Sequence, residues 1–346
     1  MKVGILTYHD ANNYGAVLQA YALLAKLKEL GHNVYVIDRV RTFKGWRYWY
    51  HGYSYKHHFS WCRFKEFYKY KLSPKTSMYK TTELIKKDFP NLHLNAVVVG
   101  SDQVWRDTFM GHNFFLDFVS GDCKRISYAA SFGLSEWTNS GPFTLKAKRL
   151  LQKFDKISVR EKTGVDICKN IFGVNAELVL DPTLLWNADF YIQTLLRNEG
   201  NARENAVVVS YILGKNKDQQ LAVQTFAKKE KLKNVNLLDV KSLLKGHYTV
   251  EEWLQQIRAA QYVITNSFHA TVFCILFHKH FVVLDNKSGG SDRIITLLEA
   301  VGLRSLLIET SEDLLATLNI PIDYEKVDKK IAELRMNSLN FLKSAL

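Results

Sequence analysis

The sequence lacks the motifs that mark several large classes of enzyme. It contains no GxxxxGK[ST] phosphate loop, no GxGxxG after the first predicted strand, no HExxH and no GxSxG turn. These absences argue against P-loop NTPases, nicotinamide-dependent dehydrogenases, zinc proteases and serine hydrolases. The cysteines are few and have no metal-ligand spacing: Cys62, Cys123, Cys168 and Cys274. We therefore expect reduced thiols, a cytoplasmic protein and no metal site.

Long apolar runs are also missing. The run at residues 271–277 stops at His278 and is far shorter than the roughly 20 residues that cross a bilayer. The start, Met1–Leu6, predicts a strand rather than a signal peptide. The hydrophobic fraction is 47% and the charged fraction 23%, as in an ordinary globular protein. Because 346 residues exceed what one hydrophobic core usually serves, two domains are expected.

Positive charge is in excess and unevenly distributed. The net charge is +13, and residues 41–71 hold eight Lys or Arg, one Glu, three His and thirteen aromatic residues. This basic aromatic insertion suits an anionic membrane surface, a single-stranded nucleic acid or a carbohydrate, or it packs its rings against its own domain. Because the chain has no recognised nucleic-acid module, we expect no nucleic-acid partner.

Short apolar segments of strand length alternate with segments of helical periodicity. Strands are expected at 3–7, 34–37, 96–99, 125–130, 157–159, 177–180, 206–212, 235–238, 262–265 and 281–284, and helices at 16–30, 217–230, 250–260, 292–301 and 324–346. This alternation predicts parallel sheets joined by right-handed crossovers.

We therefore predict an α/β protein with two doubly wound, Rossmann-like domains facing a cleft. The N-terminal domain spans 1–190 and carries the insertion 41–71. The C-terminal domain spans 203–322, and the connection lies near 187–205, where the apolar periodicity fades. The residues 323–346 form a helical tail that we expect to pack on the N-terminal domain.

Polar residues follow the carboxyl ends of several predicted strands, the edge at which doubly wound sheets bind ligands. These candidate binding residues are Asn13, Tyr14, Gly15, Ser101, Asp102, Ser131, Arg160, Asn266, Ser267, Phe268 and His269. Five separate segments thus converge on one type of sheet edge.

The segment around His269 follows an apolar strand and opens an apolar helix. Asn266 or Ser267 would cap this helix, whose first amides and positive dipole end attract an anion. There His269 would hold a phosphate or carboxylate and transfer a proton, or it is simply a half-buried histidine. Arg160 offers a two-pronged donor for an anion, or pairs with an acid such as Glu161.

The carboxyl group of Asp102 has three possible roles at its strand end. It serves as a general base, binds sugar hydroxyls, or caps the next helix. The pair Gly289–Gly290 before Arg293 is a weaker candidate for an anion loop, because Ser291 suits a helix cap equally well.

Six segments occur in a characteristic order: Asn13–Leu23, Val99–Trp105, Ser127–Gly133, Ile157–Glu161, Asp181–Leu185 and Thr265–Ala270. Together they resemble the polysaccharide pyruvyl transferase family. The resemblance covers roughly residues 1–305, and the insertion and the C-terminal tail lie outside it.

The resemblance implies a GT-B-like fold and a role in capsule or exopolysaccharide biosynthesis. The implied reaction moves the enolpyruvyl group of phosphoenolpyruvate onto two hydroxyls of one sugar and forms a cyclic pyruvate ketal. The donor is a substrate, and no other cofactor is implied. The acceptor is a polysaccharide or a lipid-linked oligosaccharide.

The family's functional residues match positions in this chain. The resemblance implies His269 as general acid and phosphate contact, Asp102 as base or orienter of the attacking hydroxyl, and Arg160 as donor ligand. Many members have an Arg-x-His pattern where this chain has Ser267. We expect Arg293, the helix amides or a lysine to replace that arginine.

Two other functions are compatible with the same fold. One is a GT-B-like glycosyltransferase that uses a nucleotide sugar, and the other is a non-catalytic, glycan-binding member of the family. If residues 41–71 contact anionic lipid, the protein is peripheral on the inner face of the cell membrane, where a lipid-linked acceptor would lie.

Overall fold

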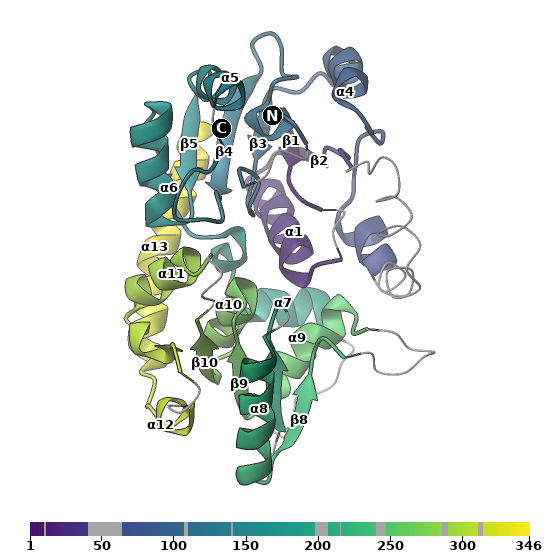
Figure 1. Ribbon diagram of the computed structural model, residues 1–346. Coiled ribbons are helices and arrows are strands. Elements are labelled where there is room, and N and C mark those ends of the chain that lie inside the picture. The colour runs from purple at the N-terminus through teal and green to yellow at the C-terminus, as the bar shows by residue number, and fades with distance from the viewer. Residues whose placement is uncertain are drawn as a thin grey trace, which may run out of the picture. The chain divides into compact units, whose positions relative to one another are not determined.

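The computed structural model describes residues 1–9, 12–40, 64–106, 110–139, 141–197, 207–214, 216–239, 247–285, 290–310 and 314–346. These residues form two compact units (Figure 1). The first contains described residues of Met1–Ser54 and Glu66–Leu185 together with Glu333–Leu346, and the second is built on Trp186–Ala332. The last helix, α13 (Tyr324–Ala345), is therefore divided between the two units.

The first unit is built on a parallel sheet in the order β2-β1-β3-β4-β5-β6. Its strands are β1 (Lys2–Leu6), β2 (Asn33–Val36), β3 (Ala96–Val99), β4 (Lys124–Ala130), β5 (Lys156–Val159) and β6 (Glu177–Leu178). Its α-helices before the last one are α1 (Tyr14–Glu29), α4 (Thr82–Asp88), α5 (Pro142–Leu151) and α6 (Lys162–Ile167). All four residues of β3 are buried, as its continuous apolar run predicts for a central parallel strand.

Alternation along the strands separates two packed faces of this sheet. Leu6, Val97 and Val99 join one core cluster with Leu151 of α5 and Ile167 of α6. Their sequence neighbours in β1 and β3 point to the opposite face. There the strands meet further buried side chains rather than water, so both faces of the sheet are covered.

The C-terminal segment completes the first unit. Ser338 of α13 is 1% exposed, and its Oγ accepts a hydrogen bond from the backbone N–H of Leu180 at 2.9 Å. Tyr128 of β4 donates its hydroxyl to the carbonyl of Leu180 at 3.0 Å, and its ring lies 6.2 Å from that of Phe341. Residues far apart in the sequence thus close one side of the sheet.

The second unit has a parallel sheet in the order β11-β10-β9-β7-β8. Its strands are β7 (Val207–Tyr211), β8 (Lys233–Asn236), β9 (Tyr262–Thr265), β10 (His280–Leu284) and β11 (Leu307–Ile308). Its helices before α13 are α7 (Ala188–Leu195), α8 (Lys217–Lys229), α9 (Val250–Ala259), α10 (Phe268–Leu276), α11 (Asp292–Val301) and α12 (Leu314–Leu318). The helices α8 and α12 share a core cluster with residues of β7, β9 and β10, and α8 lies in front of the sheet in Figure 1.

One strand lies at a different place from the prediction. We expected residues 235–238, whereas β8 spans Lys233–Asn236 and pairs Lys233 with Val207. Because β8 is an edge strand, the exposed Lys233 and the half-buried Asn234 are tolerated in it. The apolar pattern therefore misplaced the strand by two residues.

Most of the basic aromatic insertion, residues 41–63, lies outside the described residues. Its described end, Phe67–Lys71, forms a helical turn in which Phe67 and Tyr68 are buried. The Phe67 ring packs edge-on against Tyr21 of α1, with centroids 5.7 Å apart. At this end the rings pack on their own unit. Among the described helices, none combines the length and the apolar character needed to cross a membrane.

Replacing Ser338 by alanine should lower the free energy of unfolding by about 1–3 kcal/mol, because the buried N–H of Leu180 loses its acceptor. Ser344→Ala is the matched control, since Ser344 is exposed on the same helix and bonds only the carbonyl of Phe341. Urea denaturation followed by circular dichroism measures both. Equal effects of the two substitutions would show that the contact between α13 and Leu180 contributes nothing.

Candidate functional site

The turn after β3 places Asp102 at the carboxyl edge of the first sheet. Gly100 has φ +107°, and a Cβ there would lie 2.4 Å from the carbonyl oxygen of Tyr128, so no side chain fits. Asp102 itself has φ +73°, a conformation that non-glycine residues hold only where the surroundings enforce it. Its carbonyl accepts from the N–H of Ser131 at 3.0 Å and of Val104 at 2.7 Å.

Arg160, which follows β5, holds two carboxylates at this edge. Its Nη1 donates to Asp181 Oδ2 at 2.6 Å and to Ser101 Oγ at 3.3 Å, and its Nη2 donates to Asp102 Oδ1 at 3.1 Å. The Arg160 side chain is 1% exposed, that of Asp102 14% and that of Asp181 0%. Asp102 is therefore the member of this cluster that water and a substrate can reach.

The protonation state of Arg160 follows from its neighbours. Burial lowers the pKa of the guanidinium, but the negative charges of Asp181, Asp102 and Glu161 raise it, and the net shift is upward. The guanidinium thus stays charged, and its charge is compensated within the unit. Arg160 fixes the orientation of the Asp102 carboxylate by a charge-assisted hydrogen bond.

Asp181 belongs to this cluster, although the sequence did not single it out as a site residue. Its Oδ1 accepts from the N–H of Thr183 at 3.0 Å and from the Thr183 hydroxyl at 2.6 Å. Its Oδ2 accepts from Arg160 and, at 2.9 Å, from the hydroxyl of Ser101. The motif Asp181–Leu185 signalled the segment, but only the fold shows that its carboxylate anchors Arg160.

The start of α1 contributes a capped turn to the same edge. Asn13 Oδ1 accepts from the N–H groups of Gly15 at 2.9 Å and Ala16 at 3.3 Å, so Asn13 is the N-cap. Tyr14 is 5% exposed. The N–H groups of Gly15 and Ala16 are thus already bonded to Asn13.

A buried polar chain links α1 to the Asp102 turn. Gln19 Nε2 donates to Thr7 Oγ1 at 2.9 Å, and Thr7 Oγ1 donates to the carbonyl of Ser101 at 2.9 Å. Gln19 is 0% exposed and Thr7 1% exposed. Beside them His9, 1% exposed, lies with Nε2 2.8 Å from Asp38 Oδ1 and Nδ1 3.1 Å from the Thr7 carbonyl. Our sequence reasoning assigned no role to His9 or Asp38.

In the second unit, the Asn266 side chain, at the end of β9, is hydrogen-bonded to the loop that follows β7 and to α8. Its Oδ1 accepts from the N–H of Leu213 at 2.7 Å, and its Nδ2 donates to the Leu213 carbonyl at 3.0 Å and to Gln219 Oε1 at 3.3 Å. These bonds fix the loop between β7 and α8 against the start of α10.

The start of α10 carries His269, as the sequence predicts. Ser267 is the N-cap residue by its extended backbone, but its side chain makes no capping hydrogen bond. His269 is 7% exposed in the first turn, where helix amides and the dipole favour an anion. Arg293, from the first turn of α11, lies over the Phe268 ring with 5.9 Å between the guanidinium carbon and the centroid. Within the described part of the chain, Arg293 is therefore a cation beside this helix start.

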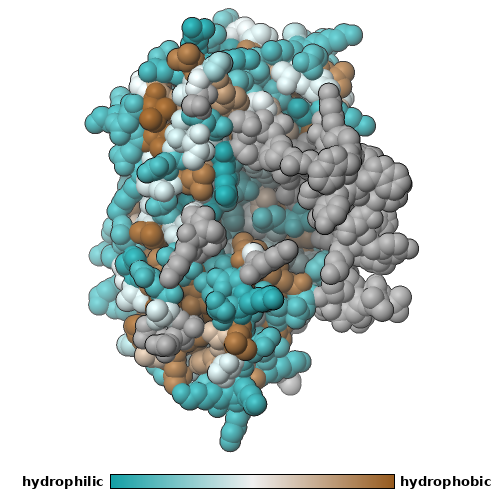
Figure 2. Space-filling view, viewed as in Figure 1, coloured by the Kyte–Doolittle hydropathy of each residue, from teal (hydrophilic) through white to brown (hydrophobic). Residues whose placement is uncertain are grey.

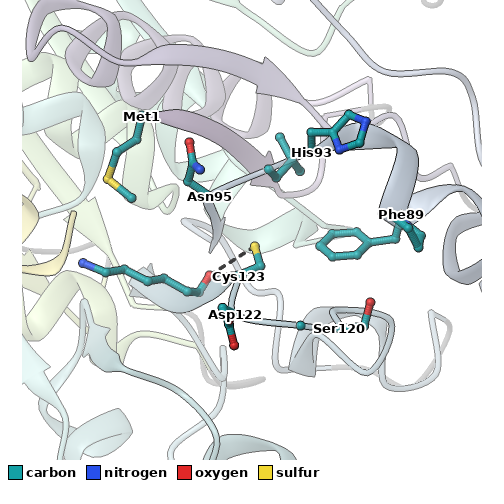
Figure 3. A pocket seen from close by; sticks show the side chains of 11 residues that line it. Met1, Phe89, His93, Asn95, Ser120, Asp122 and Cys123 are labelled. Atoms are coloured by element: carbon teal, nitrogen blue, oxygen red, sulfur yellow. Dashed lines mark hydrogen bonds between the residues drawn. The ribbon is translucent and has the colours of Figure 1, made fainter.

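Two hollows of the described surface lie elsewhere. A cavity of about 510 Å³ opens at the amino ends of β1, β3 and β4, the edge opposite Asp102, among residues that include Met1, Asn95 and Cys123 (Figure 3). Burial raises the pKa of the Cys123 thiol to about 11, so it is not a nucleophile near neutrality. A groove of about 440 Å³ lies between α8 and α12, beside the hydrophilic surface at the end of α8 (Figure 2).

The predicted site residues fall into two groups, one in each unit. The group in the first unit lies at one edge of its sheet and at the start of α1, and consists of Ser101, Asp102, Ser131, Arg160, Asn13, Tyr14 and Gly15. The group in the second unit lies at the start of α10 and consists of Asn266, Ser267, Phe268, His269 and Arg293. Among the described residues, no group of three His, Cys, Asp or Glu side chains is arranged to hold a metal ion.

A family model described as polysaccharide pyruvyl transferase matches residues 13–288. The match contains Asp102, Arg160 and His269 and so reaches both groups of candidate site residues, whereas Arg293 lies beyond its end. A search of curated proteins gave no match.

Several solved structures resemble the chain in fold. A UDP-GlcNAc 2-epimerase from Methanocaldococcus jannaschii is 12% identical, with a TM-score of 0.57 and coverage of 98% of this chain and 100% of that one. The UDP-GlcNAc 2-epimerase from Neisseria meningitidis is 11% identical, with a TM-score of 0.54 and coverage of 100% of this chain and 94% of that one. A glycosyltransferase from Rickettsia africae ESF-5 is 9% identical, with a TM-score of 0.52 and coverage of 98% of this chain and 93% of that one. Identities this low show the fold alone. They confirm the predicted GT-B-like architecture of two parallel-sheet α/β domains.

Replacing Asp181 by alanine should lower the free energy of unfolding by about 3–5 kcal/mol, because it leaves the buried Arg160 with one of its two carboxylate partners missing. Asp122→Ala, at an exposed position of the same unit, should change it by less than about 0.5 kcal/mol. Urea titrations of both variants give the values. A loss below 1 kcal/mol for Asp181→Ala would mean that Asp102 alone holds Arg160.

Proposed function

The chain belongs to the polysaccharide pyruvyl transferase family, and from this membership we propose that it transfers the enolpyruvyl group of phosphoenolpyruvate to a sugar. Two hydroxyls of the acceptor are bridged, and the products are a cyclic pyruvate ketal and inorganic phosphate. The observation that carries the proposal is the family match over 13–288. It spans an acid-base pair of the kind that the reaction needs, Asp102 and His269.

The donor is a small molecule with a carboxylate and a phosphate, so it needs cationic groups and free donors. In our proposal the start of α10 binds one of these anions, since Ser267 does not cap the helix with its side chain. Arg293, beside Phe268, takes the place of the arginine that many family members have at the position of Ser267. His269 contacts the phosphate and donates a proton.

The role of Arg160 is refined by its contacts. Its two terminal nitrogens already donate to Asp181 and Asp102, so a donor anion would have to share a guanidinium whose charge is compensated. We propose that Arg160 acts chiefly by positioning Asp102. The direct donor contact expected for Arg160 stays a prediction.

The chemical steps can be written with the protons balanced. An acid, His269, protonates the methylene carbon of the donor while the adjacent carbon gains oxocarbenium character. A sugar hydroxyl attacks that carbon as Asp102 accepts its proton, and the C–O bond to phosphate breaks. The second hydroxyl then attacks the same carbon and gives its proton to the departing phosphate, which completes the ketal. The proton held by Asp102 returns to His269 through solvent. The positive field at the start of α10 stabilises the departing phosphate.

The acceptor and its location belong to the same proposal. A lipid-linked oligosaccharide or a polysaccharide precursor at the cytoplasmic face of the membrane would present the two hydroxyls. The basic residues of 41–71 would then bring the protein to anionic lipid as a peripheral enzyme.

The protein should co-sediment at low salt with vesicles that contain anionic lipid, and it should not co-sediment with neutral vesicles.

Phosphoenolpyruvate should stabilise the protein against heat, whereas UDP-GlcNAc should not. At about 100 times its Kd the donor adds about 2.7 kcal/mol to the free energy of unfolding. A thermal-shift titration with each compound, with inorganic phosphate as a third ligand, measures this. Stabilisation by UDP-GlcNAc alone would favour the nucleotide-sugar enzyme.

His269→Ala should lower the rate of phosphate release from phosphoenolpyruvate by about 10²–10⁴-fold, because a positioned acid is lost. The control is His280→Ala, at an exposed position of β10 in the same unit. Phosphate is measured in the presence of a panel of sugar acceptors. Equal rates for the two variants would remove His269 from the mechanism.

A further inference from the structure

His9 presents both ring nitrogens to oxygen atoms at the end of β1. Nδ1 lies 3.1 Å from the carbonyl oxygen of Thr7, and Nε2 lies 2.8 Å from Asp38 Oδ1. The side chain is 1% exposed, and that of Asp38 is 16% exposed. Water therefore has almost no access to the imidazole, and these two oxygens are its hydrogen-bond partners.

The two partners decide how many protons the ring carries. A carbonyl oxygen only accepts, so Nδ1 carries a hydrogen. Burial raises the pKa of the Asp38 carboxyl, but the hydrogen bond and charge of His9 and the charge of Lys75 lower it, and the net shift is downward. Asp38 is then ionised near neutrality and also only accepts. Because both nitrogens face oxygens that only accept, the geometry favours a hydrogen on each, which makes the ring an imidazolium.

Charged groups around the pair come from two described segments. Asp38 follows β2, and Lys75 belongs to a segment that bridges to Val36 of that strand. Arg39, next to Asp38, is buried and donates instead to Asn113 Oδ1 at 2.7 Å and to the carbonyl of Lys80 at 3.1 Å. The carboxylate of Asp38 thus contacts His9 directly and interacts with the charge of Lys75 at longer range.

Thr7 connects this ion pair to the candidate base. Its carbonyl accepts a hydrogen bond from His9 Nδ1, and its hydroxyl donates a hydrogen bond to the carbonyl of Ser101, the residue before Asp102. Gln19 donates to the same hydroxyl and so fixes its direction. Asp102 is held through its carboxylate by Arg160 and through the preceding carbonyl by Thr7.

We propose that His9 is a positioning residue for Asp102. Its imidazolium binds the Thr7 carbonyl and the Asp38 carboxylate and so fixes the position of Thr7. The hydroxyl of Thr7 in turn fixes the carbonyl of Ser101, in the turn that carries Asp102. The consequence for catalysis rests on the proposed function, whereas the charge state and the ordering of the turn do not.

The charge state can be measured on the unmodified protein. With ¹⁵N-labelled histidine, long-range ¹H–¹⁵N correlation at pH 7 should show both His9 nitrogens protonated, the signals being assigned by their loss in His9→Gln. In Asp38→Asn the ring needs only one proton, so one nitrogen should lose its hydrogen. A neutral His9 tautomer in the unmodified protein overturns the proposal.

The ordering of the turn is measured by amide hydrogen exchange on peptides that cover 99–105. His9→Gln should speed exchange there by about tenfold, as expected when a charge-assisted hydrogen bond is lost. The control His278→Gln breaks an exposed pair of the same kind, with Asp328 at 3.0 Å, in the second unit, and should leave 99–105 unchanged. Asp38→Asn, which keeps the ring, should have an intermediate effect. Unchanged exchange in both His9→Gln and Asp38→Asn overturns the proposal.

Phosphate release separates this inference from the proposed function. His9→Gln should lower kcat by about tenfold and leave the KM for phosphoenolpyruvate unchanged, because only the placement of the base is affected. A protein that shows the expected exchange and nitrogen signals but releases no phosphate contradicts the proposed function and leaves the positioning role intact. Normal kcat with a disordered turn contradicts the role of His9 in catalysis.

Discussion

The buried contact of Arg160 with Asp181 and Asp102 is the constraint on which the first unit's site depends. A charged guanidinium without access to water is tolerable only where acceptors are already in place. Here they come from two segments, the turn that holds Ser101 and Asp102 and the segment of Asp181. Ser101 and Thr183 satisfy the remaining lone pairs of Asp181. The arrangement leaves a single partly exposed carboxylate, that of Asp102. Fixed in direction and close to solvent, it is suited to accept a proton from a bound hydroxyl.

The second unit carries the helix start that we propose as the site for negative charge. The start of α10 offers amides and His269, the side chain of Ser267 makes no cap, and Arg293 lies over Phe268. Asn266 is committed to the neighbouring loop and gives the helix start its position. The proposed base therefore lies in one unit and the proposed anion site in the other. Arg293, from the first turn of α11, lies over the Phe268 ring and is the cation that we propose in place of the arginine that many family members have at the position of Ser267.

The sequence predicted the fold better than it predicted the contacts. Runs such as Ala96–Val99 are too apolar for a half-exposed strand, so periodicity placed most strands well; the polar edge strand β8 was misplaced because edge strands need little apolar character. The polar strand ends and the six motifs located Asp102, Arg160 and His269. The anchor of Arg160 is Asp181, and the partner of His9 is Asp38, 29 residues away along the chain. Such pairs form only when the sheet order brings separate strand ends together, and no local pattern encodes that order.

The membership of Glu333–Leu346 in the first unit has a consequence for biosynthesis. During translation the ribosome completes β1 to β6 long before the segment that supplies Ser338 and Phe341. Until that segment emerges, the N–H of Leu180 and the ring of Tyr128 lack their partners, and the nascent domain exposes an apolar side. The domain whose synthesis begins first is therefore completed only when the last residues of α13 emerge.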